Sequence, residues 1–183
     1  MRTVAIAAIT IDGKIALNAK SGSWWTSKED KDFLHDFLDT ADAVVVGNNT
    51  YTATLEPLSK RNCIVLTRST KSEKRWHDKL LFVNPAHSDL RRLLERYETV
   101  AILGGAQTYA YCLSHDLTDE LYITIEPLIF GRGVDLFTTM PTPAHCTLLS
   151  TKQLNEKGTL LLHYRVAHTP DDPLSAYPTS PLA

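Results

Sequence analysis

The chain has 183 residues, of which 43% are hydrophobic and 22% charged, and its formal net charge is −2. This length and composition predict one globular domain with a sizeable core. The near-neutral charge argues against a general nucleic-acid binder, and no apolar run reaches the ~20 residues that would span a bilayer. The three cysteines and seven histidines fall in no metal-binding pattern. We therefore expect a cytoplasmic protein that binds neither nucleic acid, nor a membrane, nor a metal.

The first two-thirds of the chain alternates short apolar runs with helical patterns. Residues 3–11 are β-branched and alanine-rich and predict a buried strand, while apolar residues at helical spacing follow Ser27. Strands are also predicted over 43–46, 63–66, 80–83 and 100–103, and helices over 89–96 and from the Gly104-Gly105 pair to about His115. Strands that alternate with helices favour a parallel, doubly wound α/β sheet.

The last third has a different pattern. A strand is predicted over 121–126, and the runs 147–154 and 159–166 predict a hairpin that adds an antiparallel edge to the sheet. Prolines concentrate near the end of the chain. We therefore expect residues 1–167 to form the domain and residues 168–183 to form an extended tail.

Two strand ends carry glycines suited to binding a phosphate group. Gly104-Gly105 lies where a predicted strand meets a helix, so the N–H groups of Ala106 and Gln107 could bind an anion such as a pyrophosphate. The run 47–50 repeats this arrangement, with Gly47 at the strand end and Thr50 in the first helical turn. Each pattern alone is equally typical of a tight turn, but two on neighbouring strands would face one crevice.

A third strand end carries hydroxyl groups and a guanidinium. Thr67, Arg68 and Ser69 follow the strand predicted over 63–66 and are suited to a phosphate monoester. A solvated loop has the same composition, so the sequence leaves both interpretations open.

Asp30 is a candidate for proton chemistry. It precedes Phe33 and Leu34 by three and four residues, which places it on the inward face of the predicted helix. A buried acid has a raised pKa and could hold or protonate a nitrogen heterocycle. Ser27-x-x-Asp30 also resembles a capping box, in which Asp30 would only stabilise the helix start. Spacing alone favours the cap over the catalytic role.

In their order and spacing, these motifs resemble the dihydrofolate reductase superfamily, which includes the reductase domain of the riboflavin-pathway deaminase-reductase. The resemblance covers about residues 4–166. It is carried by the opening strand 6–12, the segment 25–30, the two glycine turns at 47–50 and 103–109, Thr124 in a Leu-Tyr-Ile-Thr run, and the Gly-x-Gly-x-Asp-Leu-Phe pattern of 131–137. Residues 118–131 are especially similar to the riboflavin-type branch.

The resemblance implies a single α/β domain with a mainly parallel twisted sheet, an antiparallel C-terminal edge and helices on both faces. It implies hydride transfer from NADPH to a C=N bond of a pterin, in the first instance dihydrofolate. The alternative is reduction of 5-amino-6-(5-phosphoribosylamino)uracil in riboflavin biosynthesis, and a third reading is an NADPH-binding homologue without catalysis. Its partners would be small molecules, with a homodimer left open.

The resemblance also assigns roles to individual residues. Asp30 and Thr124 match catalytic positions. The substrate-binding positions are Ala8, Leu34 and Arg61, and the cofactor-binding positions are Ile15, Gly47, Thr50, Thr67, Arg68, Ser69, Gly104, Gly105, Ala106, Gln107 and Tyr109.

Some positions depart from the folate-reducing pattern. Asn48 stands where dihydrofolate reductases carry an arginine toward the cofactor phosphate, so a preference for NADPH would depend on residues 67–69. Lys31 and Thr54 replace apolar residues that pack on folate, and Lys60 matches the carboxylate-binding arginine as well as Arg61 does. These departures bear on the folate substrate more than on the reductase chemistry.

Overall fold

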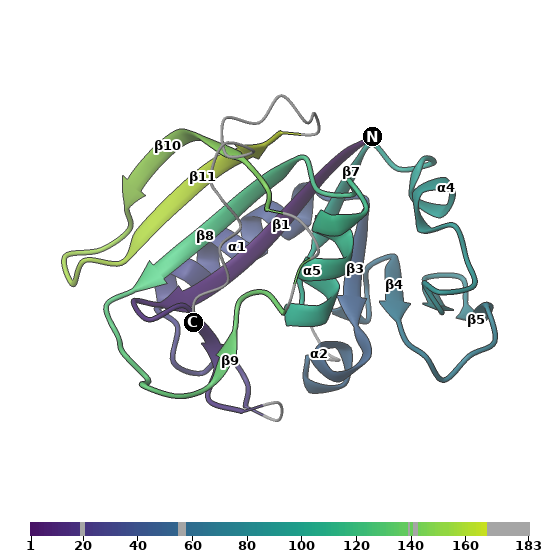
Figure 1. The fold of residues 1–183 in the computed structure, drawn as a ribbon, viewed down its shortest axis with the longest axis horizontal. Helices are drawn as coiled ribbons and strands as arrows, with labels where there is room; N and C mark the ends of the chain where they lie inside the picture. The colour runs from purple at the N-terminus through teal and green to yellow at the C-terminus, as the bar shows by residue number, and fades with distance from the viewer. Residues whose placement is uncertain (19–20, 55–57, 139, 141–142, 168–183) are drawn as a thin grey trace, which may run out of the picture.

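A computed structural model (Figure 1) describes residues 1–18, 21–54, 58–138, 140 and 143–167, so the predicted tail 168–183 lies outside the described residues. A nine-stranded sheet has the strand order β10-β11-β8-β1-β7-β3-β4-β6-β5. The elements are β1 (Arg2–Thr10), β2 (Lys14–Ala16), α1 (Lys28–Thr40), β3 (Ala43–Gly47), α2 (Asn48–Ala53), β4 (Cys63–Leu66), β5 (Glu73–His77), β6 (Leu80–Val83), α4 (Leu90–Leu94), β7 (Thr99–Ile102), α5 (Ala106–Ser114), β8 (Glu120–Glu126), β9 (Val134–Asp135), β10 (Cys146–Gln153) and β11 (Leu160–Val166).

The centre of the sheet is parallel, as the sequence predicts. From β8 to β6, every pair of neighbouring strands runs parallel. The predicted C-terminal hairpin forms the antiparallel edge, because β11 pairs with β8 and β10 pairs with β11. A second antiparallel edge strand, β5, is not predicted from the sequence. All five of its residues are exposed and most are polar, so no apolar alternation marks it as a strand.

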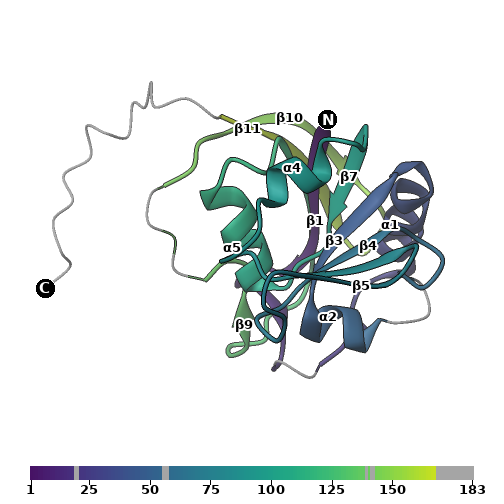
Figure 2. The ribbon, with the colours of Figure 1, turned by 90° about the vertical axis from the view of Figure 1, so that its right-hand side faces the viewer.

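Helices cover both faces of the sheet, which confirms the predicted layers. Successive residues of a strand point to opposite faces, and Val44 packs in one cluster with Leu38 of α1 while Val45 packs in another with Leu90 of α4 and Cys112 of α5. Figure 2 shows α5 on one side of the sheet and α1 on the other. Among the described residues, no helix has the length and apolar character needed to cross a membrane.

An ionic cluster joins three adjacent strands of the sheet. The guanidinium of Arg2 on β1 donates two hydrogen bonds to Glu120 on β8, at 3.0 and 2.7 Å. Nε2 of His163 on β11 lies 2.6 Å from the same carboxyl group, and the His163 ring stacks on Tyr122 at 4.0 Å between centroids. The hydrogen bond from Arg2 is the main reason that the pKa of Glu120 falls from 4.5 to about 2.

This cluster predicts a stability loss in acid. Because the pKa of Glu120 is lower in the folded protein, its contribution is present above pH 4.5 and is lost as the pH falls toward about 2. We expect Glu120→Gln to lose about 2 kcal/mol of unfolding free energy at neutral pH, after allowance for the exposure of Arg2, and almost nothing in strong acid. Urea unfolding across this pH range tests the prediction. Glu156→Gln, an exposed change in the β10–β11 turn, is the control, and an equal loss in that variant would contradict it.

Candidate active site

Asp30 lies in the first turn of α1, and its carboxyl group is not used as a helix cap. Ser27 is the N-cap, and its Oγ accepts the N–H of Asp30 at 3.2 Å, as half of a capping box requires. The reciprocal bond differs from the sequence pattern, because the N–H of Ser27 donates to Oε1 of Glu126 at 2.6 Å. Glu126 therefore takes the place expected of Asp30 in the cap, and the Asp30 carboxyl group is free for another role.

The carboxyl group of Asp30 is buried, with 6% of the residue exposed. Burial is the main effect and raises its pKa above 3.8, while the hydroxyl groups of Thr124 and Thr26 act in the opposite direction. The charge of Glu126 also raises the pKa, and that of Lys31 lowers it. The net effect favours the protonated form of Asp30.

One buried hydroxyl group, that of Thr124, acts directly on Asp30. One buried indole N–H, that of Trp25, precedes Asp30 by five residues in the chain. Within the described part of the chain, Oγ1 of Thr124 and Nε1 of Trp25 make no hydrogen bond of regular geometry. Thr124 is fully buried and pairs across the β1–β8 ladder with Ala8. The Thr124 hydroxyl lies close enough to the Asp30 carboxyl group to lower its pKa, so the indole N–H of Trp25 is the group that calls for a polar ligand or a water molecule.

The two glycine turns contact each other directly. The N–H of Gly47, at the end of β3, donates to the carbonyl of Gly104, after β7, at 2.6 Å. Gly104 has a φ of +84°, and a Cβ on it would lie 2.5 Å from the ring of Tyr109. Gly105 caps α5 without any side-chain hydrogen bond. At the start of α5 the N–H groups of Thr108 and Tyr109 both donate to the carbonyl of Gly105, at 2.8 and 3.0 Å, so those of Ala106 and Gln107 are the ones that could bind an anion.

Tyr109 connects the Gly104-Gly105 turn to the centre of the sheet. Its hydroxyl group donates to the carbonyl of Ile6 on β1. Burial raises its pKa, and the nearby charge of Asp30 adds to this shift. The phenol is therefore neutral and in electrostatic reach of Asp30. The glycine turns and Asp30 thus lie in one region at the carboxyl ends of the central strands, where α/β sheets bind ligands.

A polar hollow of about 490 Å³ lies at the end of β4 and β6, lined by Arg68, Ser69, Thr70, Lys71, Asn84 and His87. Thr67 does not line the hollow, but its hydroxyl group shares a 2.9 Å hydrogen bond with the hydroxyl group of Ser69, which does. The sequence did not predict that Lys71, Asn84 and His87 line the same hollow as Arg68 and Ser69. Asn84 follows the neighbouring strand β6, so its position after a strand end was the signal that could have found it.

Three further residues were predicted to bind substrate or cofactor, namely Ile15, Leu34 and Arg61. Leu34 is half-buried one turn further along α1, and Ile15 is half-buried in β2. Arg61 forms a salt bridge with Asp39 at 2.6 Å and donates to the carbonyl of Leu38. Asp39 is about 13 Å along the helix from Asp30, so the structure does not bring Arg61 to that group. Among the described residues, no group of three His, Cys, Asp or Glu side chains is placed to hold a metal ion.

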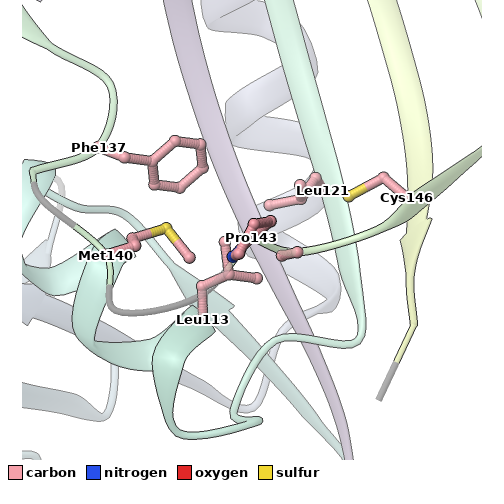
Figure 3. Close-up of a pocket in the computed structure, with 7 residues that line it drawn as sticks. Leu113, Leu121, Phe137, Met140, Pro143 and Cys146 are labelled. Carbon is pink, nitrogen blue, oxygen red and sulfur yellow. The ribbon is translucent and has the colours of Figure 1, made fainter. Parts of the chain in front are cut away.

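A second cavity, of about 390 Å³, is apolar and lies elsewhere (Figure 3). Leu113 lines it from the C-terminal part of α5, whereas the glycine turns precede the N-terminus of that helix. The other lining residues are Leu121, Phe137, Met140, Pro143, Ala144 and Cys146. None of them is a predicted site residue, but Phe137 packs edge-to-face on Tyr109, with 6.4 Å between the ring centroids.

Comparisons with known proteins agree with this geometry. The family model described as dihydrofolate reductase matches residues 3–154. An uncharacterized protein, YwjB of Bacillus subtilis (strain 168), is 30% identical over 172 residues, which cover 89% of this chain and 97% of that protein.

Two solved structures share the fold. A pyrimidine reductase-like protein from Corynebacterium diphtheriae superposes with a TM-score of 0.73 at 17% identity, over 92% of each chain. Dihydrofolate reductase from Enterococcus faecalis, complexed with NADP(H) and RAB-propyl, superposes with a TM-score of 0.64 at 21% identity, over 90% of this chain and 96% of that one.

Proposed function

The chain belongs to the dihydrofolate reductase family, and from this premise we propose that it is an NADPH-dependent reductase of a C=N bond in a pterin or an aminopyrimidine. One observation carries the proposal. The carboxyl group of Asp30 is buried, is not used as a cap, and faces Thr124 in the same region as two glycine turns that are hydrogen-bonded to each other.

The residues present fit a phosphorylated dinucleotide. The glycine turns and the uncapped start of α5 suit a pyrophosphate, and the hollow beside them contains Arg68 and Lys71, which suit the 2′-phosphate that distinguishes NADPH from NADH. No carboxylate that could bind a ribose hydroxyl lines this hollow among the described residues. When bound, NADPH would supply the hydride and leave as NADP⁺.

The protein's own contribution would be orientation and a proton. Ionised Asp30 would accept hydrogen bonds from the amino and ring N–H groups of the heterocycle, with the Thr124 hydroxyl supporting it. The raised pKa of Asp30 helps this residue to take up a proton. The ring nitrogen of the C=N bond must gain a proton as the carbon gains a hydride, and Asp30 would assist that transfer. The balanced reaction consumes one NADPH and one proton for each bond reduced.

Different observations favour the two substrates. A buried acid suits the amino and ring N–H groups of dihydrofolate. The likeness to the Corynebacterium pyrimidine reductase-like protein favours a pyrimidine, and so does Lys31, a half-buried cation beside Asp30 where an apolar folate contact is expected. Steady-state NADPH oxidation with dihydrofolate, and separately with 5-amino-6-(5-phosphoribosylamino)uracil, decides between them. NADPH binding without turnover of either would contradict the proposal and favour a non-catalytic homologue.

Gly105→Ala tests the role of the glycine turn. A Cβ on Gly105 would meet only Oγ1 of Thr50, at 3.5 Å, and its φ of −74° is ordinary for alanine, so we expect the fold to survive. The methyl group would lie between the two turns, where the phosphates are proposed to bind. We expect NADPH affinity to fall roughly tenfold or more, measured by fluorescence titration. Gly22→Ala, where nothing lies within 4 Å of the added atom, is the control, and normal binding by Gly105→Ala would make the turn purely structural.

A further inference from the structure

Glu126, at the end of β8, is a second buried acid close to Asp30. Only 3% of the residue is exposed. It follows Thr124 by two residues, so both side chains leave the same face of the strand. Burial is the main reason that the pKa of Asp30 is raised, and the charge of Glu126 adds to it. Two carboxyl groups that share a site of low dielectric constant do not ionise independently.

Both oxygens of Glu126 already act as acceptors. Oε1 accepts the N–H of Ser27 at 2.6 Å, and Oε2 accepts the hydroxyl of Thr159 at 2.7 Å. Both oxygens are therefore held by donors, one at the cap of α1 and one in the β10–β11 turn. The carboxyl group of Asp30 has the hydroxyl groups of Thr124 and Thr26 beside it.

The bonds of Glu126 also fix the position of α1. Ser27 caps this helix, so the bond from its N–H holds the first turn, and with it Asp30, against β8. On the other side, Thr159 belongs to the β10–β11 turn, where Asn155 accepts its N–H at 3.2 Å. The amide of Asn155 in turn donates to Glu29 on α1 at 3.1 Å. Glu126 therefore lies at the centre of a network that joins α1, β8 and the hairpin.

We propose that Glu126 is a positioning residue for Asp30: its hydrogen bonds hold the start of α1 against β8, and its carboxyl group acts electrostatically on that of Asp30. The inference rests on the proposed function, because it concerns the proton that Asp30 would supply to the substrate. The other charged group that acts on Asp30 is Lys31 on the same helix, and Asp30 in turn raises the pKa of the Tyr109 phenol on α5.

The test is a titration of Asp30 in the substrate-free protein, followed by carbon-13 NMR of its carboxyl group. Glu126→Gln keeps nearly the same shape and removes the charge together with one acceptor oxygen, and we expect the midpoint of Asp30 to move about one pH unit lower. Glu126→Asp keeps a charge on a shorter side chain and should stay near the wild-type midpoint, with a lower melting temperature. Thr159→Val removes one hydrogen bond and no charge, and should likewise leave the midpoint in place.

Two outcomes would overturn the inference. One is an unchanged midpoint in Glu126→Gln, and the other is an equal shift in Thr159→Val, which would assign the effect to packing. If Glu126→Gln does not fold, a full one-unit fall in Glu126→Asp has the same meaning, because that variant keeps the charge.

The titration also separates this inference from the proposed reaction. If the midpoint moves as expected but neither substrate is reduced, the pair of acids stands and the reaction does not. If a substrate is reduced and the midpoint is unaffected by Glu126→Gln, the reaction stands and the role of Glu126 does not.

Discussion

Asp30→Asn is expected to lower turnover of the preferred substrate by about 10²–10⁴-fold, the usual contribution of acid–base assistance, without loss of the fold. Asparagine has nearly the same shape as aspartate but cannot supply a proton or the two acceptor oxygens of a carboxylate. The helix cap should be unaffected, because the cap uses the backbone N–H of Asp30 and the side chains of Ser27 and Glu126.

The stability of this variant has a definite sign. The pKa of Asp30 is raised in the folded protein, so the folded state holds the proton more tightly and the ionised carboxylate destabilises it as the pH rises above 3.8. Removing the charge should therefore leave the melting temperature unchanged or increase it at neutral pH. Turnover, melting temperature and the pH–rate profile of Asp30→Asn would be measured together. Near-normal turnover would contradict a catalytic role.

Asp32→Asn is the matched control for these measurements. Asp32 is an exposed residue of the same helix and pairs with Lys28 on its outer surface. This change removes one carboxylate from α1, as Asp30→Asn does, but away from Thr124. We expect it to leave turnover within about twofold of wild type, because exposed i,i+4 ion pairs contribute little.

Arg68→Ala is expected to raise the KM for NADPH by about 10–100-fold and to leave the KM for NADH nearly unchanged. A hydrogen bond to a charged group contributes about 1.5–3 kcal/mol, and only NADPH has a 2′-phosphate to receive it. Arg68 lines the polar hollow together with Lys71, and its side chain is exposed to an entering ligand.

Arg75→Ala provides the comparison for Arg68. Arg75 is an exposed arginine of β5 that donates to the carbonyl of Asp78 at 3.1 Å and does not line the hollow. The Arg75→Ala change removes one positive charge from this edge of the sheet, as Arg68→Ala does. Equal effects of Arg68→Ala on both cofactors would remove Arg68 from 2′-phosphate recognition, and a loss as large in Arg75→Ala would indicate only a general electrostatic attraction.

Local pattern was sufficient for much of the fold. The apolar run of β3 and the alternation of short strands with helices predicted the parallel sheet, because a strand covered on both faces is continuously apolar. The cap at Ser27 was also predicted, since it depends on residues three apart. The short, charged and fully exposed β5 was not, because its pairing with β6 leaves no apolar signature in the sequence.

For the candidate site, too, some features could be predicted from the sequence and others could not. A residue at a strand end, such as Gly47 or Gly104, could be assigned from the sequence, since the carboxyl ends of parallel strands meet at one edge. That Gly47 donates to Gly104, that Lys71 and His87 join Arg68, and that Glu126 caps α1 are contacts between distant segments. The capping pattern alone favoured a cap role for Asp30, because the competing acceptor for the Ser27 N–H is ninety-nine residues away. Only the tertiary structure, which brings the end of β8 next to the start of α1, showed that Glu126 and not Asp30 accepts the N–H of the cap residue.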